Sequence, residues 1–353
     1  MNTLLHTSVF EGEDGLKNYL TPGSLGPTPL VELPVKLNPF HTERVRIFIK
    51  LATALPLGNI KSLPAWNMLE RFTLELGGEE VGTSKVRSTE LPSSLIEYSS
   101  GNTALSLTVL APYFGIPETR AIIAPDVPEI KQRLLRLVGA QLLLTHGPAS
   151  PQVFAQEGGI YEASILADTH GWKHLNQYTN PGNPDASSRY IGNELIEQLG
   201  DKLSVLVTSI GTSGTITGLA TSLKTANPNI KIVGTSIKTG SSIPGPRGEV
   251  AIQSLAFPWQ SLVDVEIPIT TIPAYTRALE LIRSGLFVGP STGMQFEGVY
   301  NYIKRVIESG EHTTLRNTDG ELVVTFLACD SMHPYIDDFF KVLPDDHFPK
   351  IIQ

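Results

Sequence analysis

The sequence predicts an α/β protein whose mostly parallel, twisted sheets are covered by helices. Apolar stretches with the length of strands alternate with longer stretches of helical character along most of the 353 residues. The chain is long enough for one large or two medium domains with a sizeable core. Such folds bind ligands at the carboxyl ends of their strands, so the loops that follow strands are the places to look for a site.

The first half of the chain alternates strands and helices. Two glycines end the helical stretch at residues 62–78, and glycine commonly closes a helix. The expected strands span residues 45–52, 93–99, 120–125 and 141–145. The expected helices span residues 62–78, 103–115 and 128–140. This alternation is typical of parallel strands joined by helical crossovers.

The second half continues the pattern, with two long loops between its elements. The expected strands span residues 204–210, 231–237 and 322–330, and a helix is expected at residues 216–226. Residues 148–159 are interpreted as a loop that can serve as a crossover. Residues 239–257 are rich in Gly, Pro and Ser, which is typical of an active-site flap. The tail after residue 333 carries apolar side chains, so we expect it to dock on the protein.

Composition and charge exclude several classes of function. The net charge is −8 and no basic block occurs, so no nucleic-acid partner is expected. No apolar run reaches the roughly 18 residues of a membrane span, and the N-terminal stretch lacks the pattern of a secretory signal. A single cysteine, Cys329, is expected to be a buried, inert thiol, and a cytoplasmic location fits these features. His170 and His174 lack further ligands besides Asp168, so no metal site is predicted.

A glycine-rich turn follows the strand at residues 204–210 and opens a helix. It consists of Gly211, Thr212, Ser213, Gly214 and Thr215. The glycines let the backbone approach an anion, and the helix start offers unpaired N–H groups. The turn lacks the lysine of the nucleotide P-loop, so it indicates a monophosphate held mainly by neutral donors. An ordinary strand–helix turn is the alternative for this loop taken alone.

Three further segments carry candidate functional groups. The loop at residues 99–103 follows a strand and opens a helix, so its hydroxyls and amides suit a carboxylate; a simple helix cap is the alternative. Lys61 precedes a helix among apolar neighbours, where a desolvated amine becomes a competent nucleophile; a surface lysine is the alternative. The segment at residues 289–293 precedes a helix and is a turn by itself.

Taken together, these segments resemble one family. In order, the motifs PLGNIKSLPA, EYSSGNTA, LNQYTNPGNP, SIGTSGTITG and FVGPSTG are similar to those of pyridoxal-phosphate enzymes of the cysteine synthase type. That group also includes cystathionine β-synthase and the serine and threonine dehydratases. The resemblance extends over about residues 25 to 340.

The resemblance implies a role for each motif. Lys61 is expected to form the Schiff base with pyridoxal 5'-phosphate and then to act as acid and base at the substrate Cα. The cofactor phosphate is expected to bind Gly211, Thr212, Ser213, Gly214 and Thr215. Asn102 would contact the ring hydroxyl, and Ser291 would face the ring nitrogen. The substrate carboxylate is expected to bind Ser99, Ser100, Gly101, Asn102, Thr103 and Gln177.

The resemblance also implies an organisation and a reaction. A smaller mobile domain is expected at residues 54–165, and a larger cofactor-binding domain at residues 1–53 and 166–353, with the cofactor in the cleft between them. Relatives are usually homodimers that act on small amino acids. The expected reaction is β-replacement on serine or an O-activated serine through an aminoacrylate. A β-eliminating lyase or dehydratase that releases a keto acid is the alternative, and an inactive regulatory homologue is a third.

Several positions depart from the family pattern. Ser62 and Leu63 replace the acid–base pair that usually follows the lysine. The segment at residues 180–190 lacks a usual histidine, and the flap carries Arg247, which could pair with an acidic substrate group; a solvated loop arginine is the alternative. These changes favour a specialised enzyme over a housekeeping cysteine synthase.

Overall fold

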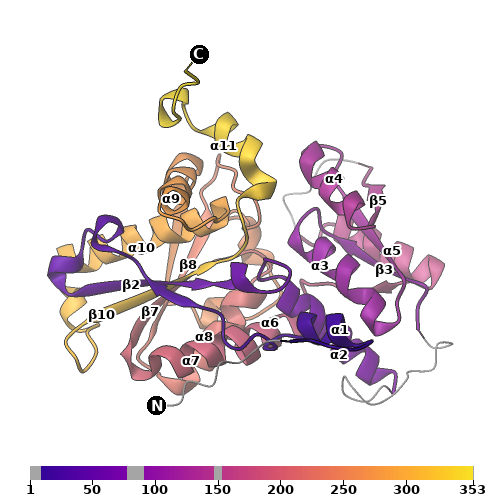
Figure 1. The fold of residues 1–353 in the computed structure, drawn as a ribbon, viewed down its shortest axis with the longest axis horizontal. Coiled ribbons are helices and arrows are strands. Elements are labelled where there is room, and N and C mark those ends of the chain that lie inside the picture. The colour runs from indigo at the N-terminus through magenta and orange to yellow at the C-terminus, as the bar shows by residue number, and fades with distance from the viewer. Residues whose placement is uncertain (1–8, 78–90, 147–152, 353) are drawn as a thin grey trace.

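The computed structural model describes residues 9–77, 91–146 and 153–352, which fold around two sheets (Figure 1). The larger sheet has the strand order β1-β2-β10-β7-β8-β9, and the smaller sheet has the order β5-β4-β3-β6. Neighbouring strands run parallel throughout both sheets, except that β1 is antiparallel to β2. The predicted fold class, with two mostly parallel sheets covered by helices, is therefore confirmed.

The strand bounds agree closely with the apolar stretches of the sequence. The larger sheet contains β1 (Leu30–Glu32), β2 (Val45–Leu51), β7 (Leu203–Ser209), β8 (Lys231–Ile237), β9 (Val265–Ile269) and β10 (Leu322–Ala328). The smaller sheet contains β3 (Ser94–Tyr98), β4 (Glu118–Ile123), β5 (Gln141–Leu144) and β6 (Lys173–His174). The strands β1, β6 and β9 are not predicted, because two of them are very short and β9 is an edge strand that contains Pro268.

The helices lie on the faces of the two sheets. They are α1 (Gly15–Leu20), α2 (Ser62–Glu75), α3 (Asn102–Leu110), α4 (Glu129–Leu137), α5 (Gly159–His170), α6 (Gly182–Ser187), α7 (Asn193–Leu199), α8 (Gly214–Ala226), α9 (Thr271–Arg283), α10 (Pro290–Glu308) and α11 (Ile336–Val342). Figure 1 shows α7 and α8 on one side of the larger sheet and α9 and α10 on the other. Among the described residues, no helix combines the length and apolarity that a membrane crossing requires.

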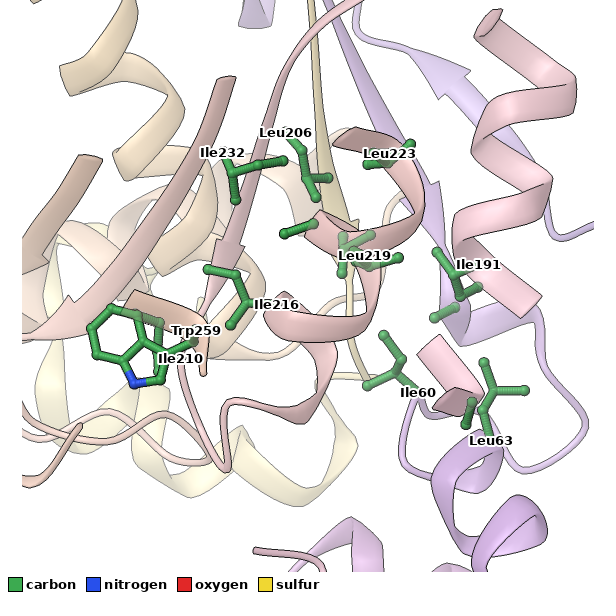
Figure 2. Packing of buried hydrophobic residues seen from close by; sticks show 14 of the residues in the cluster. Ile60, Leu63, Ile191, Leu206, Ile210, Ile216, Leu219, Leu223, Ile232 and Trp259 are labelled. Carbon is green, nitrogen blue, oxygen red and sulfur yellow. The ribbon is translucent and has the colours of Figure 1, made fainter. Parts of the chain in front are cut away.

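The larger sheet is buried on both faces, which explains its almost continuous apolar strands. On one face, Leu206 and Ile232 pack with Leu219 of α8 (Figure 2). On the other face, Val207 of β7 packs in a cluster with Phe296 of α10. The strand β10 lies at the centre of this sheet, between β2 and β7.

The smaller sheet is covered by α2 and α3 on one face and by α5 on the other. Trp66 of α2 packs with Leu95 of β3 and Leu107 of α3, and all three side chains are fully buried. On the opposite face, Ile96 packs with Ala163 of α5. Since α2 begins directly after Lys61, this packing fixes the helix that carries the candidate nucleophile at its start.

Two contacts join the segment before α2 to the end of β10. The Ile60 amide donates a hydrogen bond to the Cys329 carbonyl (2.8 Å), and Asn59 forms an isolated β-bridge with Asp330. The Ser62 hydroxyl donates to the Asn59 carbonyl (2.8 Å) and closes the turn between them. The carboxyl end of the central strand therefore anchors the backbone on which Lys61 sits.

The flap and the C-terminal tail both pack against other elements of the protein. The backbone of Ile237 bridges Gly248, so the flap at residues 239–257 folds back against β8. The tail docks as predicted, because Phe339 and Leu343 of the α11 region pack on Tyr275 of α9. Part of the predicted loop at residues 148–159 lies outside the described residues.

The smaller sheet draws its strands from residues 94–174, so β6 lies beyond the predicted domain boundary at residue 165. The division into two domains stays a prediction.

Candidate active site

A cavity of about 750 Å³ lies where the strand ends of the two sheets face each other. Its wall combines the loop after β3, the loop after β7, the end of β10 and the starts of α2, α3 and α10. Most of the predicted site residues line it, namely Lys61, Ser99, Ser100, Gly101, Asn102, Thr103, Gln177, Gly211, Thr212, Ser213, Thr215 and Ser291. Gly214 is the exception, because it is buried directly behind the loop against Asn183.

Lys61 lies immediately before the first residue of α2 and lines the cavity. Burial lowers the pKa of its amine from the ordinary value, and the nearby Cys329 thiol partly opposes this shift. A lowered pKa increases the fraction of neutral amine near pH 7, which is the form that attacks a carbonyl or accepts a proton. The side chain therefore has the properties expected of an amine nucleophile.

The turn between β7 and α8 is built to receive an anion. Ser213 adopts a left-handed backbone conformation (φ 65°), which is uncommon for residues other than glycine. Its hydroxyl is buried and has no hydrogen-bond partner among the described residues. The Thr212 hydroxyl oxygen accepts hydrogen bonds from the Asn183 amide (2.8 Å) and the Gly214 N–H (3.3 Å). The turn is thus tied to Asn183 through Thr212, while the Ser213 hydroxyl is free for a ligand.

The loop after β3 is hydrogen-bonded to Asp330, which follows β10, and to Gln177, which follows β6. The Asn102 amide donates to the Asp330 carboxylate (2.7 Å), which also accepts a hydrogen bond from the Tyr335 hydroxyl (2.6 Å). Burial raises the pKa of Asp330 despite these two donors. The Thr103 hydroxyl donates to the Gln177 side-chain oxygen (2.7 Å), so Gln177 contacts this loop.

Ser291 is buried in the first turn of α10 and faces the thiol of Cys329. The Gln295 amide also donates to this sulfur (3.1 Å). Burial raises the pKa of Cys329 to about 11, so the thiol is neutral. Cys329 is half-buried in the cavity wall rather than enclosed in the core, because β10 ends at Ala328 and Cys329 is the next residue.

Glu97 is a buried carboxyl that supports Gln177 from behind the cavity. Its side chain accepts backbone N–H groups of Asn176 (3.1 Å) and Gln177 (3.5 Å). Burial raises the pKa of Glu97 to about 8, whereas burial lowers the pKa of the adjacent His174 to about 4. Both groups are therefore neutral near pH 7, and their separation of 3.9 Å is no ion pair.

We expect the free energy of unfolding of the Glu97→Gln variant to fall less steeply with rising pH, between pH 6.5 and 8, than that of the wild type. The unfolded carboxyl ionises near its ordinary pKa of 4.5, whereas the folded one keeps its proton up to about pH 8. The proton on Glu97 therefore stabilises the folded protein fully below pH 4.5. This contribution to the free energy of unfolding is lost as the pH rises from 4.5 through 8. His174 acts only at lower pH, because its depressed folded pKa removes stability as the pH falls from 6.5 to about 4.

The measurement is the free energy of unfolding in urea at several pH values for the wild type and the Glu97→Gln variant. The wild type should lose about 1.4 kcal/mol per pH unit more than the variant within this window. Parallel profiles would show that Glu97 is already ionised in the folded protein.

Three residues of the site are not predicted from the sequence. The Asn183 amide donates a hydrogen bond to Thr212, and the Asp330 carboxylate accepts one from Asn102. The Glu97 carboxyl accepts one from the backbone N–H of Gln177. A carboxylate directly after an apolar strand was a usable signal for Asp330, since strand ends line the site of an α/β fold. Asn183 and Glu97 gave no such signal, because their contacts join residues far apart in the sequence.

Comparison with known proteins identifies the family. A family model described as pyridoxal-phosphate-dependent enzyme matches residues 22–315. Cysteine synthase B of Salmonella typhimurium is 29% identical over 326 residues, which cover 92% of this chain and 96% of that protein. Cysteine synthase of Aquifex aeolicus is 30% identical over 293 residues, which cover 81% of this chain and 84% of that protein. The chain therefore belongs to the pyridoxal-phosphate-dependent enzymes.

Within that family the protein is an enzyme of the cysteine synthase type, and the predicted family and cofactor are confirmed. A solved structure of O-ureido-L-serine synthase has the same fold, with a TM-score of 0.71. It is 20% identical in sequence, and the match covers 90% of this chain and 93% of that one.

The cavity fits pyridoxal phosphate on three observations. The Ser213 hydroxyl is buried without a described partner, as expected of a donor that awaits a phosphate. The Lys61 amine is desolvated and lines the same cavity as the phosphate turn. The remaining wall supplies an amide at Asn102 and a hydroxyl at Ser291, which are neutral groups suited to a ring hydroxyl and a ring nitrogen.

Proposed function

We propose that this enzyme catalyses β-replacement on serine or an O-activated serine, such as O-acetylserine or O-phosphoserine. The incoming nucleophile carries sulfur, nitrogen or another attacking atom, and the enzyme serves a specialised rather than a housekeeping pathway. The observation that supports this proposal best is the convergence of Lys61, the 211–215 turn, the 99–103 loop and Ser291 on one cavity. When bound, pyridoxal phosphate would withdraw electrons from the substrate Cα and so acidify its Cα–H bond, and the electron pair left at Cα after proton loss could then expel a β-leaving group.

We assign each predicted residue its role on the same basis. Lys61 attaches to the cofactor aldehyde and carries the proton to and from Cα. The phosphate is held by Gly211, Thr212, Ser213, Gly214 and Thr215, Asn102 contacts the ring hydroxyl, and Ser291 contacts the ring nitrogen. The substrate carboxylate is bound by Ser99, Ser100, Gly101, Asn102, Thr103 and Gln177.

The neutral character of Ser291 favours elimination at Cβ over other reactions of the cofactor. A hydroxyl does not force the ring nitrogen to be protonated, so the ring stays a weaker electron sink than it would be beside a carboxylate. Ser291 is further held by the neutral Cys329 thiol, which adds no charge at this end of the cavity. Reactions that need a stronger electron sink, such as decarboxylation, are therefore disfavoured.

The altered residues after Lys61 support a specialised enzyme. Ser62 and Leu63, which replace the usual acid–base pair, are both buried, and the Ser62 hydroxyl donates to the Asn59 carbonyl. They therefore reshape the packing behind the nucleophile without adding charge to the cavity. This is consistent with an intact cofactor site in altered surroundings.

The test is a screen of serine donors against nucleophiles, with mass detection of the coupled amino acid. β-Replacement predicts one donor and nucleophile pair that gives a coupled product faster than keto acid is released. Steady keto-acid release with every nucleophile would instead establish the lyase or dehydratase. Failure of the holoenzyme to change its cofactor absorbance with any donor would indicate an inactive homologue.

We also propose a cytoplasmic homodimer whose smaller part, residues 54–165, closes over the substrate carboxylate. Closure is supported by the position of the 99–103 loop, which starts α3 of the smaller sheet and is held to the larger one through the Asn102–Asp330 hydrogen bond. Light scattering on the purified holoenzyme tests the dimer, and a monomeric mass would contradict it.

A further inference from the structure

Arg247 places a permanent positive charge in the cavity wall that the reaction described above does not use. The side chain is half-buried and lines the cavity beside the predicted substrate groups. A guanidinium stays protonated at any pH at which the enzyme works, and it carries five N–H donors. Burying such a charge is costly unless an anion or several acceptors compensate for it.

The described surroundings of Arg247 supply phenols rather than carboxylates. Its guanidinium donates a hydrogen bond to the Tyr178 hydroxyl and lies 5.5 Å from the centre of the Tyr178 ring. The Tyr98 hydroxyl is its second electrostatic neighbour. No ion pair to Arg247 occurs within residues 9–77, 91–146 and 153–352. Most of its donors are therefore free to bind a ligand.

The backbone holds Arg247 in a fixed place. Its N–H donates to the Ile210 carbonyl (2.8 Å), directly before the phosphate turn, and its carbonyl accepts the Ile237 N–H (3.0 Å). The side chain then points to Tyr178, whose neighbour Gln177 is hydrogen-bonded to Thr103 of the carboxylate loop. The guanidinium is thus positioned on the substrate side of the cavity by ties to the strand ends of β7 and β8.

We propose that Arg247 binds an anionic group other than the α-carboxylate of the donor, and so selects substrates that bring this additional anion into the cavity. This rests on the proposed β-replacement. A guanidinium forms paired hydrogen bonds with a phosphate or a carboxylate. Two substrates could bring that group: a donor with a phosphate leaving group, or a nucleophile with its own carboxylate.

The first experiment measures donor binding by the change in cofactor absorbance of the holoenzyme. O-phosphoserine is compared with O-acetylserine for the wild type, Arg247→Gln and Arg247→Lys. If the phosphate is the second anion, Arg247→Gln should weaken O-phosphoserine binding roughly 30-fold or more while O-acetylserine changes less than about threefold. Lysine should restore part of the loss, because it keeps the charge without the paired donors.

The second experiment keeps the donor fixed and varies the charge of the nucleophile. Mercaptoacetate is compared with 2-mercaptoethanol, because both attack through sulfur and differ in one carboxylate. If the nucleophile carries the anion, Arg247→Gln should raise KM for mercaptoacetate alone by a similar factor, with kcat little changed. Lys341→Gln is the matched control, since Lys341 is an exposed cation at the rim of the same cavity and should alter neither comparison.

Cofactor affinity of each variant separates this inference from the alternatives. Unchanged cofactor binding together with selective loss of an anionic substrate supports the proposal. A fall in cofactor affinity would mean that Arg247 serves the phosphate of the cofactor, and equal losses for charged and neutral substrates would mean a structural role; either result overturns the proposal. Because donor binding needs no turnover, selective binding without any coupled product would contradict β-replacement while leaving the Arg247 assignment intact.

Discussion

Replacing Lys61 with alanine should lower kcat/KM at least about 1000-fold, the largest loss expected from any single substitution. Lys61 has two tasks in the proposed reaction, attachment to the cofactor and transfer of the Cα proton. Of the described lysines that line the cavity, it is the one at the start of α2. Borohydride reduction of the holoenzyme followed by peptide mapping should place the cofactor on the peptide that contains Lys61.

Lys131 provides the matched control for this experiment. It is another lysine of the cavity wall, and burial lowers the pKa of its amine as well. Its ammonium, however, lies 5.2 Å from the centre of the Tyr335 ring, and Asp338 and Asp330 attract its charge. We expect Lys131→Met to keep the label on Lys61 and to change kcat/KM by less than about tenfold. A label on Lys131, or on neither lysine, would refute the assignment of the nucleophile.

The Gly214→Ala substitution should weaken cofactor binding about 10- to 100-fold, because the added methyl group displaces the Asn183 side chain that is hydrogen-bonded to the phosphate turn. A methyl group at this position would overlap the side-chain amide of Asn183, which is fully buried. That amide donates to the Thr212 hydroxyl (2.8 Å) and to the Gln177 carbonyl (2.7 Å), so moving it releases both groups. The cofactor dissociation constant, measured by fluorescence of the apoenzyme during titration, checks this expectation.

A double-mutant cycle with Asn183→Ala tests the stated cause. Removing the Asn183 side chain creates room for the methyl group, so the double variant should bind the cofactor no more weakly than Asn183→Ala alone. Additive losses would show that Gly214→Ala acts on the phosphate directly and that Asn183 is not the intermediary.

The sequence was most informative where a strand is followed by a short polar loop. The turn at residues 211–215 and the loop at residues 99–103 could be placed in one site because carboxyl ends of parallel strands meet at one edge. The local pattern around Lys61 also fits a surface lysine, so its assignment rests on the resemblance of its motif to the family. The placing of the two loops depends on local pattern and on the topology of α/β folds, whereas the roles of the residues depend on the resemblance.

Other parts of the site depend on contacts that local pattern does not encode. The hydrogen bond between Asn102 and Asp330 joins the smaller sheet to the end of β10, and the Asn183–Thr212 bond joins α6 to the phosphate turn. Short elements such as β6 are formed by pairing with a neighbour rather than by their own two residues. For the same reason the reach of Arg247 to Tyr178 became visible only in the folded chain.

The central place of β10 has a consequence for biosynthesis. Residues 322–328 are made last among the strands, yet they separate β2 from β7, and the two residues that follow secure the backbone just before Lys61. A ribosome must therefore release nearly the whole polypeptide before the larger sheet can close. Cofactor capture is thereby confined to finished chains, and polypeptides that stop short of residue 322 should emerge from translation unable to hold it.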